Sequence, residues 1–328
     1  MAIGLLMRVE AVIAILAVIV ALAPLAANAG SLSTSFYAKT CPNLEKTVND
    51  VFQAALAKDS RIGASLLRMH FHDCFVQGCD ASITLVDTPT FKGEQTAAPN
   101  DNSIRGYDVV EAIKAAVEGI CPNTVSCADI LALVARIAVV SAHGPSWEVD
   151  FGRRDSTTAC FNCADSQLPQ SSFHVTALTS SFAAKGLDQT DMVALAGAHT
   201  FGKARCSSFS ARLGLNPPDL TLNSAYRTDL LKECPQANTD VVVNLDLTTP
   251  SDFDNQYYNN LFNHEGLLFS DEALYNEGGE TAKLVTDYSG SNQNAFFEQF
   301  AKSIVKMGEI TPLTGSQGEI RKKCSFVN

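Results

Sequence analysis

The chain has 328 residues, of which 46% are hydrophobic and 18% charged, so it can build one large core and is neither intrinsically disordered nor fibrous. Its 24 lysines and arginines stand against 35 aspartates and glutamates, and the net charge of −11 disfavours nucleic acid as a partner. Ten cysteines are many for a cytosolic enzyme that is kept reduced. These values indicate a globular protein from an oxidising compartment.

The first thirty residues have the features of a secretory signal peptide. Arg8 precedes the uninterrupted apolar run Ala11–Ala23, and Ala27-Asn28-Ala29 supplies the small-x-small pattern that signal peptidase reads. A membrane anchor would need a longer apolar stretch, and Pro24 interrupts this one. We therefore expect residues 1–30 to be removed and the mature protein to be secreted, without a membrane partner.

Apolar residues of the mature chain mostly repeat at helical spacing. Two such faces consist of Leu44, Val48, Val51, Phe52 and Ala55, and of Val109, Val110, Ile113, Val117 and Ile120. Helix N-terminal caps are predicted at Ser126 with Asp129 and at Asp188 with Asp191. The pattern favours a mainly α protein.

Strand-like alternation is confined to one segment, Val241–Leu247. Three turn-rich segments, Thr84–Asn102, Asp155–Ser172 and Gly214–Asn223, are predicted to be connections between helices. We expect at most a minor β element.

The segment Arg61–Ser82 is the densest chemical signal in the sequence. On a helix, Arg68 and His72 project from the same face, whereas His70 is turned away by about 200°. A fixed cation beside an imidazole suits proton transfer coupled to charge separation. A core histidine with a structural arginine is the plainer alternative. A zinc hydrolase using His-x-His is a remote one, because the two imidazoles diverge.

Two longer motifs identify a family. Leu67-Arg-Met-His-Phe-His-Asp-Cys-Phe-Val76, followed by Gly78-Cys-Asp80, closely resembles the distal haem signature of the secretory (class III) plant peroxidases. Asp191–Gly202 resembles the second signature of that family. The resemblance continues through Val125–Ala132, Gly152–Asp155 and Phe253–Tyr258 as far as Cys324, and so covers essentially the whole mature chain.

The resemblance implies an all-α fold, with at most a minor β element, in which one haem b lies between a distal and a proximal lobe. Residues 31–328 would form a single haem peroxidase domain. The distal lobe would comprise about 31–165 together with about 275–328, and the proximal lobe about 166–274.

The same resemblance implies roles for individual residues. His199 would be the axial ligand of the haem iron, and Asp271 would hydrogen-bond the other nitrogen of that imidazole. On the opposite face, His72 would act as acid and base, Arg68 would stabilise developing negative charge, and Asn100 would orient His72.

The implied activity is reduction of hydrogen peroxide through an oxyferryl intermediate, followed by oxidation of phenolic donors in two one-electron steps. A secreted haem-binding protein without catalytic activity is the alternative. Such a protein would keep His199 but would not need Arg68 paired with His72.

Two calcium ions are also implied, each beside a haem histidine. The distal ion and its network would involve Asp73, Val76, Gly78, Asp80, Ser82 and Glu94. The proximal ion would be bound by Thr200, Asp246, Thr249, Asp252 and Asp254. Val76, Gly78 and Asp252 would contribute backbone carbonyls.

Eight cysteines match the disulfide framework of the family. The implied pairs are Cys41–Cys121, Cys74–Cys79, Cys127–Cys324 and Cys206–Cys234. Cys160 and Cys163 lie outside this framework. We expect them to form a local disulfide or to remain two surface thiols, in preference to a redox Cys-x-x-Cys site.

The donor edge departs from the family pattern. The resemblance places donors beside Pro169, but Ser171 stands where a second proline is usual and Ser208 where an aromatic residue is frequent. The sequence therefore leaves the preferred donor open. We expect a monomer in the apoplast or cell wall, acting on hydrogen peroxide and small phenolic donors.

Overall fold

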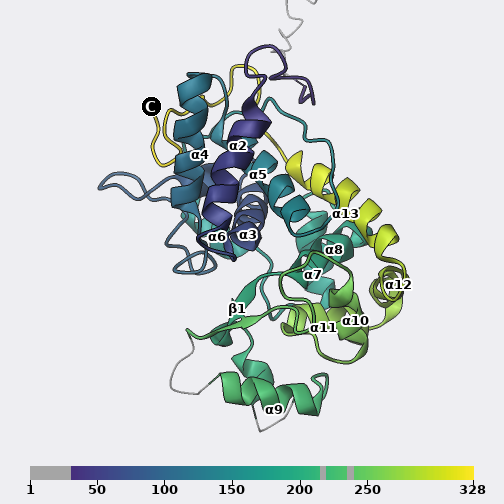
Figure 1. Ribbon diagram of the computed structural model, residues 1–328. Helices are drawn as coiled ribbons and strands as arrows, with labels where there is room; N and C mark the ends of the chain where they lie inside the picture. The colour runs from purple at the N-terminus through teal and green to yellow at the C-terminus, as the bar shows by residue number, and fades with distance from the viewer. Residues whose placement is uncertain (1–30, 215–218, 235–239) are drawn as a thin grey trace, which may run out of the picture.

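The computed structural model describes residues 31–214, 219–234 and 240–328, so the expected signal peptide lies outside it. The described residues contain twelve α-helices and one two-stranded sheet (Figure 1), which confirms the mainly α fold. Across these same ranges, no helix has the length and apolar character needed to cross a bilayer.

The first group of helices, apart from its last member α6, builds one core around α5. Its members are α2 (Leu44–Leu56), α3 (Ile62–Phe75), α4 (Tyr107–Ile120), α5 (Cys127–Ser141) and α6 (Phe161–Gln167). Both apolar faces expected at helical spacing fall on α2 and α4, whose inner residues are buried. Ser126 Oγ accepts a 3.1 Å hydrogen bond from the Asp129 N–H, which confirms the predicted cap of α5.

The second group of helices follows along the chain. Its members are α7 (Val175–Ala183), α8 (Gln189–Ala196), α9 (Ser224–Glu233), α10 (Gln256–Phe262), α11 (Phe269–Asn276), α12 (Gly279–Tyr288) and α13 (Gln293–Gly308). Short 3₁₀ turns occur at η1 (Ser82–Thr84), η2 (Gly197–Thr200), η3 (Cys206–Ser208) and η4 (Ser210–Leu213). The predicted cap of α8 is a complete capping box between Asp188 and Asp191.

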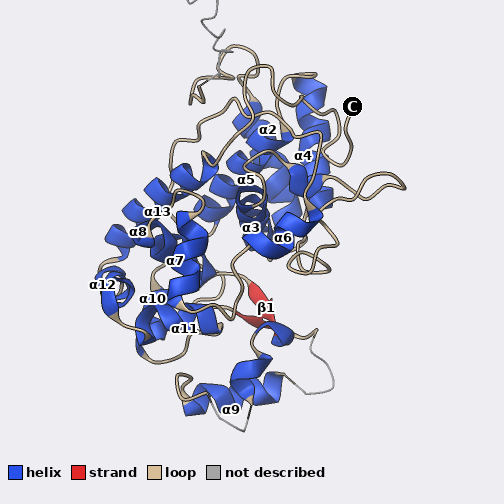
Figure 2. Cartoon of the chain, turned by 180° about the vertical axis from the view of Figure 1, so that it is seen from behind, coloured by secondary structure: helices blue, strands red, loops and turns tan. Residues whose placement is uncertain are grey.

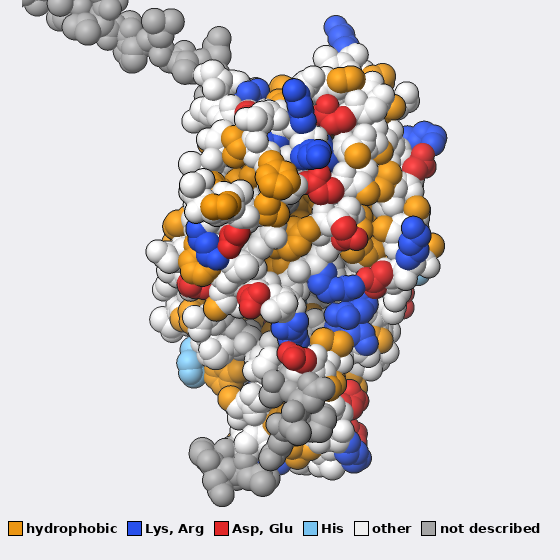
Figure 3. Space-filling model, turned by 90° about the vertical axis from the view of Figure 1, so that its left-hand side faces the viewer, with side chains coloured by type: hydrophobic (Ala, Val, Ile, Leu, Met, Phe, Trp, Pro, Cys, Tyr) orange, Lys and Arg blue, Asp and Glu red, His pale blue; other side chains and the backbone are white. Residues whose placement is uncertain are grey.

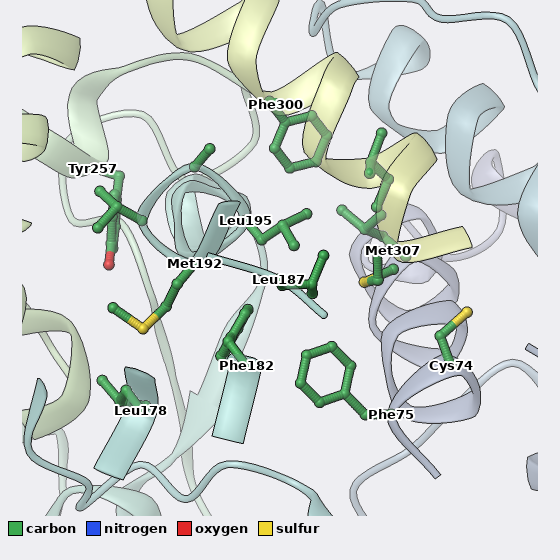
Figure 4. Close-up of a cluster of buried hydrophobic side chains, with 14 of the residues drawn as sticks. Cys74, Phe75, Leu178, Phe182, Leu187, Met192, Leu195, Tyr257, Phe300 and Met307 are labelled. Carbon is green, nitrogen blue, oxygen red and sulfur yellow. The ribbon is translucent and has the colours of Figure 1, made fainter. Parts of the chain in front are cut away.

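One large hydrophobic cluster joins the two groups of helices. It draws side chains from α3, α7, α8, α10 and α13 (Figure 4), and the rings of Phe75 and Phe182 lie 5.0 Å apart between centroids. Helix α13 packs chiefly on α8, and α12 packs on α8 and α11. Only the chain beyond them returns to α4 and α5, through Ser325 and Cys324 (Figure 1). Within the expected distal segment 275–328, α12 and α13 therefore pack mainly on the second group of helices, and the chain that follows α13 contacts the first group.

The sheet is smaller than the alternating pattern suggested. Strand β1 (Lys203–Arg205), red in Figure 2, pairs antiparallel with β2 (Val242–Asn244). Lys203 lies opposite Asn244. The predicted strand Val241–Leu247 ends early because the chain turns at Asp246, whose carboxylate accepts the N–H groups of Thr248 and Thr249. This pairing joins the chain after η2 to the segment that carries Asp246.

Five disulfides are present. Four are the pairs that the resemblance implied, and the fifth joins Cys160 to Cys163. The last pair therefore takes the form of a local disulfide. The segment Asp155–Ser172, expected to be a connection between helices, itself contains the short helix α6, and the Cys160–Cys163 bridge spans the first turn of that helix.

Charged side chains of both signs are interspersed on one face of the molecule, with hydrophobic side chains exposed between them (Figure 3). A shallow surface hollow of about 760 Å³ lies between the segment Pro145–Asp150 and α13. Trp147 lines it and packs edge-on against Phe300. This hollow contains none of the predicted site residues.

Candidate active site

Helix α3 places His72 where its imidazole is held by a loop residue. His72 Nδ1 lies 2.6 Å from Asn100 Oδ1, and Asn100 Nδ2 donates a 2.9 Å hydrogen bond to the Glu94 carbonyl. Burial and the charge of Arg68 lower the pKa of His72 well below its ordinary value, and the bond to Asn100 does not offset them. The imidazole is therefore neutral, and with Nδ1 donating to Asn100 its Nε2 is free to accept a proton.

Arg68 projects from the same helix one turn earlier. Its guanidinium donates to the carbonyls of Pro99 at 3.0 Å and Ser103 at 3.1 Å, so the loop that orients His72 also orients Arg68. The side chain is exposed to solvent, while the surrounding protein limits its hydration and lowers its pKa to about 10. Arg68 remains a cation at neutral pH.

His199 lies in η2, directly after α8. A Cβ at neighbouring Gly197 would fall 2.4 Å from Tyr258 Oη, so only glycine allows this close packing. His199 Nδ1 lies 2.8 Å from Asp271 Oδ1, and the hydroxyl of Tyr257 donates to the same oxygen at 3.0 Å. Burial lowers the pKa of His199, but the charge and hydrogen bond of Asp271 outweigh it and raise the pKa overall.

The surroundings of these residues fit a bound haem. The His199 side chain is 39% exposed although the protein surrounds it, and with Nδ1 engaged by Asp271 its Nε2 is free to bind a metal. Phe71 and Ala198 pack on the main hydrophobic cluster yet are only partly buried, as expected beside a flat apolar group. The charge of Arg68 also acts to lower the pKa of His199.

The His-x-His zinc alternative has no geometric support. His72 is engaged by Asn100, whereas His70 contacts the sulfur of Cys74, itself in a disulfide, at 3.7 Å. Within the described ranges, no three His, Cys, Asp or Glu side chains are positioned to hold a metal ion. Any calcium ion here would therefore also need hydroxyl or carbonyl oxygens.

Oxygen atoms gather at the predicted distal calcium position. Asp73 Oδ2 accepts from the Ala81 N–H at 2.9 Å, and Asp80 Oδ1 accepts from the Ser82 N–H at 3.0 Å. Burial raises the pKa of Asp73 well above its ordinary range and that of Asp80 to about 6. Ser82 Oγ and Glu94 Oε2 are buried with no hydrogen-bond partner in the described part of the chain. Unpartnered oxygens beside buried carboxylates are the donor set that a hard cation prefers.

The predicted proximal position is similar. Thr200 Oγ1 lies 3.1 Å from Asp254 Oδ1 and 3.3 Å from Asp246 Oδ2, while Thr249 Oγ1 lies 3.1 Å from Asp254 Oδ1. Burial raises the pKa of Asp246. The side chain of Asp252 instead contacts His143 at 2.9 Å. The side chains of four of the five predicted residues thus lie within hydrogen-bond distance of one another.

The predicted donor edge brings together the two serines that depart from the family pattern. Pro169 is half-buried, and Ser171 Oγ donates a 2.9 Å hydrogen bond to the Ser208 carbonyl. A hydroxyl and a carbonyl therefore occupy this edge.

Two residues of the site escaped sequence reasoning. Tyr257 shares Asp271 with His199, and the fully buried Arg321 donates to the Ala81 carbonyl at 2.8 Å while its guanidinium lies 3.9 Å from Asp155. Tyr257 falls within the Phe253–Tyr258 motif, but nothing in the spacing indicates its contact. Arg321 stands alone near the C-terminus.

A histidine held by an aspartate, and a neutral histidine one helical turn from an arginine, in a mainly helical fold, are the features of a haem peroxidase. Comparison with known proteins agrees. The family model described as Peroxidase matches residues 48–291. The chain is 51% identical to Peroxidase 4 of Vitis vinifera over 95% of this chain and 98% of that one. It is 51% identical to Peroxidase 70 of Zea mays, with 95% and 96% covered, and 49% identical to Peroxidase P7 of Brassica rapa subsp. rapa, with 90% and 100% covered. The chain belongs to the peroxidase family of plant haem enzymes.

Proposed function

We propose that this peroxidase uses one haem b, bound through His199, to reduce hydrogen peroxide and to oxidise small phenolic donors one electron at a time. Two observations support the proposal: neutral His72 lies one helical turn from cationic Arg68, and His199 is bound by Asp271. A protein that only bound haem would not need the first pair, so the non-catalytic alternative is not favoured.

The protein residues divide the work of cleaving peroxide. Haem, when bound, supplies the iron that accepts the peroxide oxygen and holds the oxidising equivalents. His72 Nε2 takes the proton from hydrogen peroxide and delivers it to the departing oxygen, which leaves as water. Arg68 stabilises the negative charge that develops on that oxygen. Asn100 holds Nδ1 so that Nε2 stays available.

Asp271 makes the proximal imidazole electron-rich. Its carboxylate accepts the Nδ1 proton, which favours higher oxidation states of a bound iron. Donors would approach the edge at Pro169, where Ser171 and Ser208 give a polar border. This border suits phenols that carry further hydroxyl groups.

We further propose that two calcium ions complete the oxygen clusters around Asp73 and Asp80 and around Thr200 and Asp246. Each cluster lies beside a histidine of the active site, so each ion would brace that histidine. The signal-like N-terminus and the five disulfides support secretion to the apoplast or cell wall. We expect residues 31–328 to act as a monomer.

The decisive experiment is stopped-flow absorption of the haem-loaded mature protein mixed with one equivalent of peroxide. A rapid change of the Soret band that reverses on addition of a phenol is expected. His72→Leu should slow the first change by about 10²- to 10⁴-fold, the contribution of a general acid–base. His143→Gln, at an exposed histidine, should leave it unchanged. A Soret band that does not change on addition of peroxide would mean that the protein binds haem but is not a peroxidase.

A further inference from the structure

Helix α6 carries the extra cysteine pair and lies against the distal side of the active site. Cys160 is its N-cap residue and Cys163 its third helical residue, and the disulfide joins them. In a capping box these two positions exchange hydrogen bonds, as Asp188 and Asp191 do in α8. In α6 the same positions are joined covalently, in place of a capping side chain.

This link matters because α6 is only seven residues long, too short to be stable by itself. The N–H of Cys160 donates a 3.0 Å hydrogen bond to Glu94 Oε1. In a capping box the N-cap N–H binds the side chain of the third helical residue. Here the acceptor comes from a distant segment, so the first turn of α6 anchors that segment.

Two more contacts join α6 to the same segment. Asp165 Oδ1 accepts a 3.0 Å hydrogen bond from the Ala98 N–H. The ammonium of Lys92 lies 4.8 Å from the centroid of the Phe161 ring. Helix α6 therefore contacts residues 92–98 at three points, which are spread along the length of the segment.

The anchored segment continues directly into the residues that orient the catalytic pair. Asn100 receives support from the Glu94 carbonyl and binds His72 Nδ1 at 2.6 Å. The carbonyl of Pro99 binds the guanidinium of Arg68 at 3.0 Å. A shift of this segment would displace both His72 and Arg68, and small displacements of catalytic groups cost much rate.

We propose that the Cys160–Cys163 disulfide is a positioning device for peroxide activation: it fixes the first turn of α6, which holds residues 92–100 and thereby His72 and Arg68. The inference rests on the proposed function of that pair. The bridge spans a sequence separation of only 3, the shortest of the five disulfides, so the chain-entropy model gives it the smallest effect on global stability among them. Its effect is local.

The test compares the haem-loaded wild type with the double variant Cys160→Ser/Cys163→Ser. Hydrogen–deuterium exchange within residues 92–104 should rise by roughly tenfold, with that of α2 unchanged. The rate constant for reaction with peroxide should fall by about tenfold, a typical cost of losing support for an active-site residue. The ferric–ferrous potential, which depends on His199 and Asp271 on the proximal side, should not change, whereas a general loss of structure would alter it.

Ser166→Ala is the matched control. It removes a hydroxyl that donates to the Asn162 carbonyl at 3.0 Å in the same helix, away from residues 92–98, and should alter neither readout. Asp165→Asn keeps the disulfide but weakens the contact with Ala98. It should raise hydrogen–deuterium exchange within residues 92–104 and lower the peroxide rate constant, both by less than in the double variant. If the double variant fails to fold, Asp165→Asn provides the test in its place.

Unchanged exchange in residues 92–104 of the double variant, or faster exchange with an unchanged peroxide rate, overturns the positioning role. A wild type that does not react with peroxide would refute the proposed function instead. In that case the exchange data still decide whether the disulfide holds the segment.

Discussion

Tyr257 and His199 bind the same oxygen atom of Asp271. The tyrosine hydroxyl donates to Oδ1 at 3.0 Å, and His199 Nδ1 lies 2.8 Å from it. Two donors thus share one carboxylate oxygen, and the negative charge that His199 receives depends on both. Tyr257 therefore affects the electron density on His199 indirectly, through the shared Asp271 oxygen.

Replacing Tyr257 with phenylalanine removes one of the two donors to Asp271 Oδ1. The hydrogen bond between Asp271 and His199 should therefore become stronger. We expect the ferric–ferrous potential of the haem-loaded enzyme to fall by about 40 mV, if a net hydrogen-bond energy of about 1 kcal/mol is transferred in this one-electron couple. Spectroelectrochemical titration measures this shift.

Tyr258→Phe is the matched control for that variant. Its hydroxyl is also buried and donates at 2.9 Å, but to the Val193 carbonyl. It should cost about 0.5–1.5 kcal/mol of stability and leave the potential unchanged. Equal potentials in the Tyr257→Phe variant and the wild type would show that the shared oxygen does not tune His199.

His70 should make the protein sensitive to acid. Burial, with a smaller effect of the Arg153 charge, lowers its pKa to about 3, whereas an unfolded histidine titrates near pH 6.5. Below pH 6.5 the unfolded chain binds a proton that the folded chain does not. Above pH 6.5, His70 therefore has no effect on the pH dependence of stability. Below pH 6.5 it lowers the free energy of unfolding by about 1.4 kcal/mol per pH unit, down to about pH 3.

The variant His70→Gln cannot take up this proton. Between pH 5.5 and 4, denaturant unfolding should show its stability declining less steeply than that of the wild type, by about 1.4 kcal/mol per pH unit. Met69→Leu, at the buried neighbouring position, should change stability by under about 1.5 kcal/mol and keep the wild-type slope. Parallel curves for wild type and His70→Gln would contradict the assignment.

The parts of the fold that the sequence predicted are those that local pattern determines. Helices α2 and α4 follow from apolar spacing, and the caps of α5 and α8 from Ser126 and Asp188. Helix α6 and strand β1 have no such pattern. The first depends on a disulfide and on contacts with residues 92–98, and the second on pairing with a strand that lies far along the chain.

The site divides in the same way. Arg68, His72 and His199 stand in motifs, so their residue numbers could be named from the sequence. Their partners depend on long-range packing. The pair His199–Asp271 was implied by the family resemblance alone, and it forms because α10 packs on η2 and on α11. No spacing rule predicts Tyr257 as a second donor to Asp271 Oδ1.

Neighbouring threonines offer a test of the proximal calcium. Thr249 Oγ1 contacts Asp254 Oδ1 at 3.1 Å, whereas Thr248 Oγ1 contacts Asn260 Oδ1 at the same distance, outside the predicted ligands. After removal of free calcium, we expect elemental analysis to find about one ion per chain in Thr249→Ala and about two in Thr248→Ala. Free calcium at 100 to 1,000 times the dissociation constant of a site stabilises the folded protein by about 3–4 kcal/mol. At such calcium concentrations, Thr249→Ala should therefore have a lower melting temperature than Thr248→Ala.

Chelation of the wild type should lower the melting temperature and the peroxide rate together. Equal calcium contents in the two threonine variants would mean that Thr249 is not a ligand.

Substitution at Ser171 should alter donor choice without altering peroxide activation. The variant Ser171→Pro removes the hydroxyl that binds the Ser208 carbonyl and adds an apolar ring beside Pro169, while the Ser171 carbonyl that accepts from the Ser270 N–H is kept. Contact of about 40 Å² with an apolar donor is worth about 1 kcal/mol, so kcat/KM for alkyl-substituted phenols should rise by roughly fivefold. Ser171→Ala removes the hydroxyl without adding the ring and should show little gain. If both variants have the wild-type kcat/KM for every phenol, donors do not use this edge. If either variant changes the rate constant for reaction with peroxide, Ser171 affects the distal side instead.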